Sequence, residues 1–531
     1  MTPGHMAAVN RQRRLSILFD AIGGHSGPWT STDPGAYFGQ ALAFADNSVS
    51  SVDMVCWDCG YGNYAAYPSA VLPPHPHPTF TRWREEGVDF LERLVGQTRR
   101  RGLECFWSHR IAEVDIGARG KEMDHLNPVK AAHPEWLLKT WWWQGLWNLA
   151  VPEVRDFKVR IIRELAERYD FDGFLIDFAR HAPVLPVGRQ WELRESVTDL
   201  MRQLREALNA VAAGRGHPIL LGARVSPNLD ACRRDGLDIE CWARHGAVDM
   251  LVTGSRSLEV ELAEFRERLG QSVKLYPCFD FHHSSDAYEA PTPELLRGIA
   301  ANWWEQGADG IAGFNYWPFR DGVDGQKTVE DAARDAQDRA FITLGDRERL
   351  RGQAKVVPVE RRGGYPWTEG AMNTNDHAQL PALLAYDGRA TDIALYCGED
   401  RDTPGGSSAT ARLHVVLAKG CFANGRITPA APAPEDELET RLNGSVLPNG
   451  RCDLAWQDRQ ILFPDPQPSA GGAASRTVNP EQRLLRISYA VAPALLYTGP
   501  NTVSVRVVHQ APHLLQQFRI EKVELELTPR P

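Results

Sequence analysis

The 531-residue sequence contains no run of about 20 apolar residues, the length that a membrane-spanning helix requires. Its first 14 residues are polar and basic, and Asp20 interrupts the apolar run that follows, so the uncharged core of a signal peptide is also missing. We therefore expect a cytoplasmic protein without a membrane partner. If the start of the chain is misassigned, an export signal would instead direct the protein to the periplasm or out of the cell.

Cysteine is scarce, and its nine copies do not form a paired pattern. Cys56, Cys105 and Cys278 fall within apolar runs, where a buried thiol packs as a small apolar side chain. Cys56 and Cys59 have the spacing of a metal-binding pair, but no second pair completes a zinc site. The sequence therefore predicts no disulfide framework, no bound metal and no cofactor.

Long blocks of one charge are also missing. Lys and Arg total 59 against 68 Asp and Glu, which gives a formal net charge of -9, and like charges gather only in short runs such as 99–101. This balance argues against nucleic acid or an anionic membrane as the main partner. The oligomeric state is left open.

Eight short apolar runs alternate with amphipathic stretches in the first two thirds of the chain, which is typical of parallel strands joined by crossover helices. The runs span Leu15–Asp20, Val52–Asp58, Leu103–His109, Gly173–Phe178, Ile219–Val225, Val248–Thr253, Val273–Asp280 and Gly310–Tyr316. Helical spacing fills the gaps at 87–100, 152–169, 191–212, 258–269 and 293–306. Eight such repeats predict an α/β fold, a closed (β/α)8 TIM barrel.

A different pattern begins after a polar helix predicted at 329–344. Short alternating runs separated by turn residues predict strands at 393–396, 412–417, 440–442, 485–489, 503–508 and 520–527. Alternation without helical spacing predicts an all-β sandwich or jelly roll. We therefore divide the chain into an N-terminal tail (1–13), a barrel (14–345), a linker (346–384) and an accessory sandwich (385–531).

Polar residues follow almost every predicted barrel strand. Because active sites of such barrels lie at the C-terminal ends of the strands, these residues are the candidate site. Flat apolar sugar faces stack on aromatic rings, and 14 of the 16 Trp residues precede residue 320, which favours a sugar as the ligand. The expected substrate contacts are Trp57, Asp58, His109, Arg110, Arg180, His181, Arg224, His282, Asn315 and Trp317.

Cleavage of a glycosidic bond usually needs two carboxyl groups, one as acid and one as nucleophile or base. Asp177 ends the fourth strand, and Arg180 and His181 would favour its negative charge, so it is the first candidate. The alternative is that Asp177 only caps the next helix or pairs with Arg180.

Asp280, which ends the seventh strand, is the second catalytic candidate, because the fourth and seventh strands face one another across a barrel mouth. It lies close to His282 and His283, so a structural hydrogen-bonding role is the alternative. Glu240 and Asp58 are the reserve candidates for the acid. Glu240 falls in a helical stretch and would need an unusual loop path to reach the mouth.

Two segments resemble a known family. The stretch 148–155 (Asn-Leu-Ala-Val-Pro-Glu-Val-Arg) and the stretch 169–177 (Tyr-Asp-Phe-Asp-Gly-Phe-Leu-Ile-Asp) are similar to the strand-entry signature of glycosyl-hydrolase-like family ten barrels. The likeness extends loosely through 225–227 and covers the barrel only. It implies a glycoside-hydrolase barrel.

The fourth strand also looks like the nucleophile strand of the alpha-amylase superfamily, which implies the nucleophile role for Asp177. That superfamily has an arginine two residues earlier, where this chain has Leu175. It also has a glutamic acid ending the fifth strand, where this chain has Arg224 and Ser226. The resemblance therefore assigns no residue of this chain to the role of the catalytic acid. The stretch 495–503 resembles accessory sandwich domains of polysaccharide-degrading enzymes.

The leading hypothesis is a glycoside hydrolase that cleaves an O-glycosidic bond in an oligo- or polysaccharide. The second is a barrel that binds carbohydrate without catalysis, suggested by the missing fifth-strand acid. The third is a metal-dependent lyase or isomerase, with Asp58, Asp177, Asp280 and His282 as ligands. The sugar, the linkage, the stereochemical outcome and exo or endo action are left open.

Overall fold

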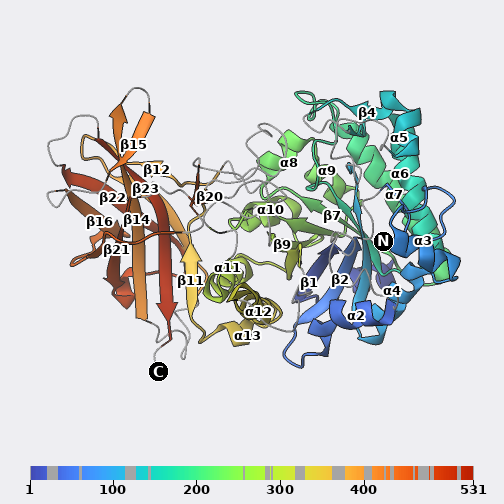
Figure 1. Cartoon of the computed structure of the whole chain (residues 1–531), viewed down its shortest axis with the longest axis horizontal. Coiled ribbons are helices and arrows are strands. Elements are labelled where there is room, and N and C mark those ends of the chain that lie inside the picture. The colour runs from blue at the N-terminus through green and yellow to red at the C-terminus, as the bar shows by residue number, and fades with distance from the viewer. Residues whose placement is uncertain are drawn as a thin grey trace.

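The chain forms two units in the computed structural model (Figure 1). The first, drawn from blue to yellow, is a closed barrel with the strand order β1-β10-β9-β8-β7-β6-β3-β2. The second, drawn from yellow (β11) through orange to red, consists of antiparallel sheets. The structure describes residues 2–20, 34–58, 63–113, 127–140, 145–254, 257–280, 288, 291–316, 329–361, 377–399, 410–423, 426–430, 436–458, 461–463, 477–478, 483–510 and 516–529.

All eight predicted barrel strands are present, and every neighbouring pair is parallel. The predicted TIM barrel is therefore confirmed. The first two strands also begin and end at the predicted residues. The strands are β1 (Leu15–Asp20), β2 (Val52–Asp58), β3 (Glu104–Arg110), β6 (Gly173–Asp177), β7 (Leu220–Val225), β8 (Met250–Thr253), β9 (Lys274–Asp280) and β10 (Ile311–Phe314).

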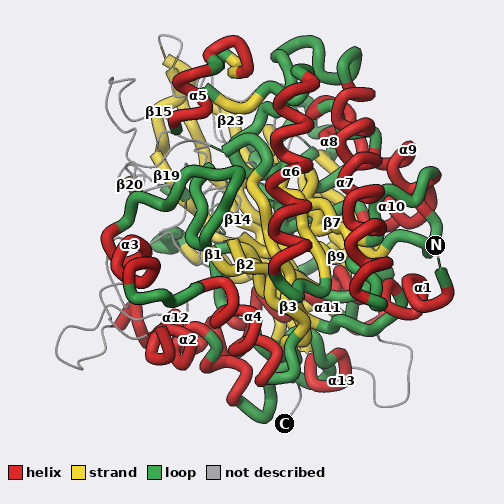
Figure 2. Tube along the Cα trace, turned by 90° about the vertical axis from the view of Figure 1, so that its right-hand side faces the viewer, coloured by secondary structure: helices red, strands yellow, loops and turns green. Residues whose placement is uncertain are grey.

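Helices surround these strands (Figure 2). The predicted helices correspond to α4 (Phe90–Arg100), α6 (Pro152–Arg168), α7 (Arg194–Arg215), α10 (Leu262–Leu269), α11 (Pro293–Glu305) and α12 (Val329–Phe341). Proline at the first helical position starts both α6 and α11, because its fixed φ suits that position and its missing N–H has no partner there. The others are α1 (Pro3–Val9), α2 (Pro34–Ala41), α3 (Pro78–Glu85), α5 (Pro128–Ala132), α8 (Leu229–Asp235), α9 (Ile239–Arg244) and α13 (Arg347–Leu350).

Side chains alternate between the barrel interior and the helix layer, as the pleat of a strand requires. The interior cluster includes Leu18, Cys56, Phe106, Leu175, Met250, Val252, Tyr276, Cys278 and Phe314. Their sequence neighbours Phe19, Trp57 and Phe174 belong instead to the cluster that the helices cover. This alternation decides which residues at a strand end face the mouth.

The base of the barrel carries the same carboxylate contact four times. Asp53, Asp172, Asp249 and Asp309 lie at the starts of β2, β6, β8 and β10, and each accepts the backbone N–H of a residue at the start of the preceding barrel strand. These donors are Arg14 (2.7 Å), Cys105 (2.8 Å), Leu221 (2.7 Å) and Leu275 (2.9 Å). The contacts therefore close every second seam of the barrel.

An arginine neutralises each of these four carboxylates. Its nitrogen lies 2.8 Å from Asp53, 3.0 Å from Asp172, 2.5 Å from Asp249 and 2.6 Å from Asp309, for Arg14, Arg99, Arg205 and Arg266 respectively. The last three belong to α4, α7 and α10, the helices that lead into β3, β7 and β9. We name these four Asp–Arg units the base clamps.

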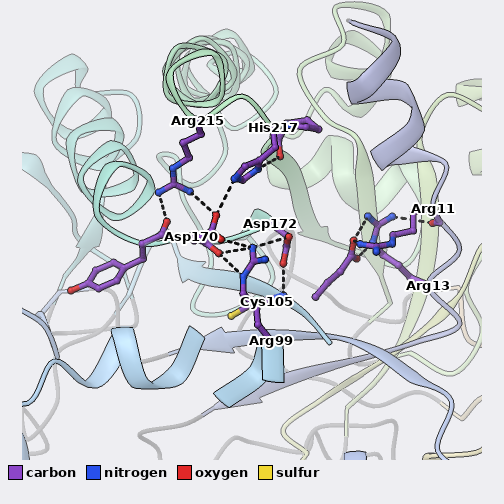
Figure 3. Close-up of polar contacts among 11 residues, drawn as sticks. Arg11, Arg13, Arg99, Cys105, Asp170, Asp172, Arg215 and His217 are labelled. Carbon is purple, nitrogen blue, oxygen red and sulfur yellow. Dashed lines mark hydrogen bonds and ion pairs between the residues drawn. The ribbon is translucent and has the colours of Figure 1, made fainter. Parts of the chain in front are cut away.

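Figure 3 shows the clamp at Asp172, where Arg99 also contacts Asp170. His217 lies 3.0 Å from Asp170, so this ion-pair network continues toward the start of β7. Nearby, Arg11 and Arg13 both pair with Glu104 of β3. The first group of ion pairs ties α4 to the starts of β6 and β7, and the second ties the N-terminal stretch to β3.

The second unit contains the six predicted strands, in sheets that run β11-β23-β14-β21-β18 and β13-β22-β16-β17. Leu413, Val415, Val503 and Val523 are buried between them, which agrees with the predicted sandwich. The strands are β11 (Lys355–Pro358), β12 (Ala382–Leu383), β13 (Thr391–Cys397), β14 (Thr410–Ala423), β15 (Arg426–Ala430), β16 (Glu437–Leu442), β17 (Ser445–Val446), β18 (Arg451–Asp453), β21 (Leu484–Val491), β22 (Gly499–His509) and β23 (Gln516–Thr528). Small two-stranded sheets join β4 (Leu137–Leu138) to β5 (Leu146–Trp147) and β19 (Leu462–Phe463) to β20 (Thr477–Val478).

Helix α11 packs closely against the sandwich. A Cβ at Gly298 would lie 2.0 Å from the carbonyl oxygen of Val356, and one at Gly398 would lie 2.3 Å from that of Ala301, so both positions require glycine. The Asn302 amide donates to the carbonyl of Tyr396 at 3.0 Å and accepts the N–H of Gly398 at 2.7 Å. The barrel and the sandwich therefore share a specific, hydrogen-bonded contact.

The predicted domain limits meet ordered structure at two places. The stretch predicted as a tail contains α1, whose His5 contacts Asp249 at 2.8 Å, and the predicted linker contains β11, which pairs with β23. The division into domains stays a prediction. None of the helices in the described ranges combines the length and the apolar character needed to cross a membrane.

Candidate active site at the C-terminal mouth of the barrel

Two aspartates at the C-terminal ends of β6 and β9 face one guanidinium group. Arg224 of β7 lies directly beside Asp177 in the strand register, and its Nη1 contacts Asp177 Oδ2 at 2.6 Å. Its Nη2 lies 4.0 Å from Asp280 Oδ2, and all three side chains are buried. The structure thus brings together both predicted catalytic carboxylates and one predicted substrate contact.

Asp177 is held at both carboxylate oxygens. Its Oδ1 accepts the backbone N–H groups of Ala179 (2.9 Å) and Arg180 (3.0 Å), while its Oδ2 accepts from Arg224. These two donors lie in the turn directly after β6, whereas the next helix, α7, begins at Arg194, so the predicted alternative of a helix cap is not what the structure shows. Two backbone N–H donors and one guanidinium therefore fix the orientation of the Asp177 carboxylate.

Asp280 has a different set of contacts. Its Oδ1 accepts from the side-chain amide of Asn315 at 3.0 Å. Asn315 follows β10 with φ 59°, the left-handed region that non-glycine residues adopt infrequently and asparagine tolerates best. Strained backbone of this kind gathers at functional sites, and here it directs the Asn315 amide toward Asp280.

A second charged group links β2, β3 and the loop after β6. The Arg110 guanidinium lies 2.7 Å from Asp58 through Nε and 3.7 Å from Glu113 through Nη1, and the Glu113 carboxylate reaches His181 Nδ1 at 2.9 Å. His181 also has a positive φ, 57°. Three of the predicted substrate contacts, Asp58, Arg110 and His181, therefore meet in one cluster.

Glu113 was not predicted from the sequence. It lies three residues beyond the end of β3, in a loop where no strand or helix pattern indicated its direction, and it has no exposed surface. Burial raises the pKa of its carboxyl, while Arg110, Arg180, Lys130 and Lys158 oppose this shift. Its position in the first turn after a barrel strand was the signal that could have identified it.

Two expected substrate contacts point away from the mouth. The Trp57 indole lies behind β2 and donates to the Thr98 hydroxyl of α4 at 3.0 Å. His109 precedes the mouth-facing Arg110 and so points to the opposite side of β3, where burial and then Lys158 lower its pKa. The predicted placement of both was wrong, because alternate residues of a strand face opposite sides.

The reserve acid Glu240 is also wrongly placed for the mouth. It lies on α9 and forms ion pairs with Arg268 (2.6 Å) and Arg233 (3.1 Å) in the helix layer. These hydrogen bonds, that of Arg268 foremost, hold the pKa of its carboxyl below the ordinary value. Asp280 and Asp58 are thus the predicted acid candidates that lie at strand ends.

The remaining predicted residues are only partly described. Arg180 is half-buried and is one of the cations that act on Glu113. His282 and Trp317 lie outside the described residues, as do Trp141, Trp142 and Trp143. Trp147 is fully buried between Lys130 and Lys158, so it forms part of the packed interior.

The cation beside Asp177 comes from a neighbouring strand. The alpha-amylase pattern has an arginine two residues before the nucleophile, where Leu175 packs into the barrel interior. Arg224, near the end of the fifth strand where that pattern has its acid, supplies the positive charge instead. Asp280 of β9 lies within reach of the same guanidinium.

The carboxylates at the mouth do not favour a metal ion. In the described parts of the chain, no three His, Cys, Asp or Glu side chains lie close enough together to hold one. Arg224 lies between Asp177 and Asp280, and Arg110 lies against Asp58. A cation bound by these carboxylates would be repelled by two guanidinium charges, so the predicted ligand set does not fit a metal well.

Part of the barrel is similar to known glycosyl hydrolase-like proteins. Residues 43–191, which include β2, β3, β6 and the residues Asp58, Arg110, Glu113, Asp177 and His181, match the model of the family described as glycosyl hydrolase-like 10. The resemblance seen in the sequence is thereby confirmed for this part of the barrel. A similar protein is "Glycosyl hydrolase YngK" of Bacillus subtilis (strain 168), 31% identical over 168 residues. That match covers 28% of this chain, and the chain spans about a third, 32%, of YngK.

Two solved structures illustrate a likeness at low sequence identity. Alpha-L-fucosidase isoenzyme 2 from Paenibacillus thiaminolyticus is 15% identical, with a TM-score of 0.41. The match covers 66% of this chain and 52% of the fucosidase chain. The glycoside hydrolase domain of PgaB (BpsB) from Bordetella bronchiseptica is 11% identical, with a TM-score of 0.40. The match covers 63% of this chain and 99% of that domain. Likeness at this level supports no inference about activity.

Proposed function

We propose that this protein is a glycoside hydrolase that cleaves an O-glycosidic bond of an oligo- or polysaccharide at the mouth of its barrel. The observation that carries the proposal is the placement of Asp177 and Asp280 at the ends of β6 and β9, against the same Arg224 guanidinium. Two carboxylates at one site are the arrangement that most glycoside hydrolases use. The match of residues 43–191 to a glycosyl hydrolase-like family supports the same reaction.

The two carboxylates suit different roles. Asp177, with donors at both oxygens, serves as the nucleophile or as the anion that stabilises the oxocarbenium-like transition state. Asp280, whose Oδ1 accepts from the Asn315 amide and whose Oδ2 lies 4.0 Å from the Arg224 guanidinium, is the group that we assign to deliver and recover a proton. Arg224 orients both, and Arg110, Asp58 and His181 are the contacts for the sugar hydroxyls.

The test is a hydrolysis assay on a panel of chromogenic aryl α- and β-glycosides and soluble polysaccharides. Asp177→Asn should lose about a thousandfold or more in kcat, since the charge that stabilises the transition state is removed, while sugar binding by calorimetry persists. Asp280→Asn should lose about a hundredfold. Asp230→Asn, at an exposed ion pair on α8, is the matched control and should behave as wild type.

Two outcomes contradict the proposal. Wild-type protein that binds members of the panel without cleaving any supports the carbohydrate-binding alternative. Activity that disappears with EDTA and returns with a divalent metal supports the lyase or isomerase alternative. For an active enzyme, the anomeric configuration of the first product, read by NMR, distinguishes a retaining from an inverting mechanism.

A further inference from the structure

An aromatic ring lies against the arginine that the two mouth aspartates share. The ring belongs to Phe314, the last residue of β10, whose side chain is part of the apolar barrel interior. The guanidinium carbon of Arg224, Cζ, lies over this ring, 3.6 Å from its centroid. So short a separation leaves no space for an N–H group between the carbon and the ring, and the two groups therefore stack face to face.

The strand register explains why the ring and the guanidinium meet. Asp177 and Arg224 are neighbours in the pairing of β6 with β7, and Asp280 and Phe314 are neighbours in the pairing of β9 with β10. Arg224 contacts Asp177 of its own pair at 2.6 Å. It also reaches both members of the other pair, since Asp280 lies 4.0 Å away and the Phe314 ring lies under the guanidinium. The guanidinium thus joins the two pairs.

Stacking leaves the hydrogen-bonding capacity of the guanidinium intact. Its N–H donors lie in the plane of the group and point outward from its edge, so a ring on its face takes up none of them. The negative face of an aromatic ring also attracts a cation, and this attraction is strongest where water is excluded. Arg224 is 0% exposed and Phe314 is 2% exposed, so water screens their contact little.

From this geometry we propose that Phe314 is a positioning residue: its ring holds the face of the Arg224 guanidinium and so keeps the edge of that group on Asp177 and Asp280. The next residue completes the arrangement, because the Asn315 amide donates to Asp280 at 3.0 Å. The end of β10 thus supports both the arginine and the second carboxylate. The kinetic part of this inference rests on the proposed hydrolase function, whereas the placement of Arg224 by the ring does not.

The experiment replaces Phe314 with ring-fluorinated phenylalanines, introduced by stop-codon suppression. Fluorine changes the size of the ring little but withdraws negative charge from its face, so packing is kept while the attraction to Arg224 weakens. With the most fluorinated ring, kcat on the substrate found above should fall about tenfold, in steps that follow the number of fluorines. KM should stay close to the wild-type value, because Arg224 orients the two carboxylates that act in the transition state.

A second measurement needs no substrate. NMR of protein with nitrogen-labelled arginine reports how fast the Nε–H of Arg224 exchanges with water, and a buried guanidinium held by a ring and two carboxylates should exchange slowly. In the fluorinated protein this exchange should be about tenfold faster, because the group leaves its partners more often. An unchanged melting temperature would separate this local loosening from general unfolding.

The chain offers a matched control on the outside of the barrel. Arg160 lies over the ring of Phe157, with 5.7 Å between its guanidinium carbon and the ring centroid, and both residues belong to α6. Phe157 is buried like Phe314, but Arg160 is exposed, so this contact of the same type is longer and is screened by water. Fluorination at position 157 should leave kcat, KM and the exchange of Arg224 unchanged.

In an active enzyme, wild-type kcat with the most fluorinated ring overturns the proposal. A fall in kcat without faster exchange at Arg224 also overturns it, because the ring would then not act through the arginine, and so does an equal effect of fluorination at position 157. If the fluorinated protein does not fold, Phe314→Leu, which has no aromatic face, replaces it with the same expected results. Faster exchange at Arg224 in a protein that hydrolyses no substrate rejects the proposed function and retains the positioning role.

Discussion

The two ends of the barrel use the same residue types in different arrangements. At the base, four aspartates each bind one strand N–H and one arginine, and the unit repeats at every second seam. At the mouth, Asp177 and Asp280 share a single arginine, and Asp58 and Glu113 share another. Each of the four base carboxylates therefore has an arginine of its own, whereas at the mouth two carboxylates share one arginine.

The base contacts tie neighbouring strands together, whereas the mouth contacts gather two carboxylates around each arginine. A base clamp satisfies its carboxylate with a backbone donor and a cation, so little of its hydrogen-bonding capacity is left for a ligand. At the mouth, one guanidinium serves two carboxylates, and positive φ values occur at His181 and Asn315, which contact this set. Such compromises are usual at functional sites, where stability is given up for a particular geometry.

The largest effect on stability is expected for the most buried clamp. Asp249→Asn should lower the free energy of unfolding by about 3–5 kcal/mol, because Arg205 then lacks its buried partner. Burial works to raise the pKa of Asp249, but His5 and Arg205 outweigh it and the net pKa is lowered. The ionised carboxylate therefore stabilises the fold above the unfolded pKa of ~3.9, and this contribution is lost as the pH falls through the folded pKa. Urea unfolding should show the variant closest to wild type in acid. An equal deficit at every pH would contradict the clamp model.

The next prediction concerns the shared arginine at the mouth. Arg224→Lys should reduce kcat/KM by about a hundredfold, or ~2.7 kcal/mol, because an ammonium group cannot contact Asp177 and Asp280 through two separate nitrogens. Arg205→Lys is the corresponding change at the base and should reduce stability with unchanged kcat per folded molecule. If both variants lose activity equally, the mouth and the base do not differ in the way described.

A smaller effect tests the position of Trp57. Trp57→Phe removes the hydrogen bond to Thr98 and part of the ring that packs against α4, so thermal unfolding should report a loss of about 1–2 kcal/mol. KM should stay at the wild-type value, because the indole lies behind β2. A rise in KM without a change in melting temperature would place Trp57 at the substrate after all.

The smallest effect is expected at a clamp that solvent reaches. The Asp309 side chain is 22% exposed, whereas that of Asp249 is 0% exposed. Asp309→Asn should therefore cost about 1 kcal/mol or less, and high salt should reduce the difference from wild type further. A cost equal to that of Asp249→Asn would show that the clamp contact, and not its burial, decides the contribution.

Strand positions were predicted well because they depend on local patterns. The runs 15–20 and 52–58 match β1 and β2 at both ends, and Asp177 and Asp280 end strands as expected. The errors at Trp57 and His109 come from treating neighbouring residues at a strand end alike, although the pleat turns them to opposite faces. The base clamps also left a signal that was not used: Asp-Met opens the second and sixth strands, and Asp-Gly precedes the fourth and eighth.

The sequence by itself determined the eight parallel strands, the change to antiparallel sheets and the residues that end each barrel strand, because hydrophobic periodicity is a property of neighbouring residues. Only the tertiary structure decided which of these residues meet. Asp177 and Arg224 are 47 positions apart, and their contact exists because β6 and β7 pair in one register. Barrel closure likewise brings Asp280 to the same guanidinium and a loop carries Glu113 to His181, contacts that no local pattern encodes.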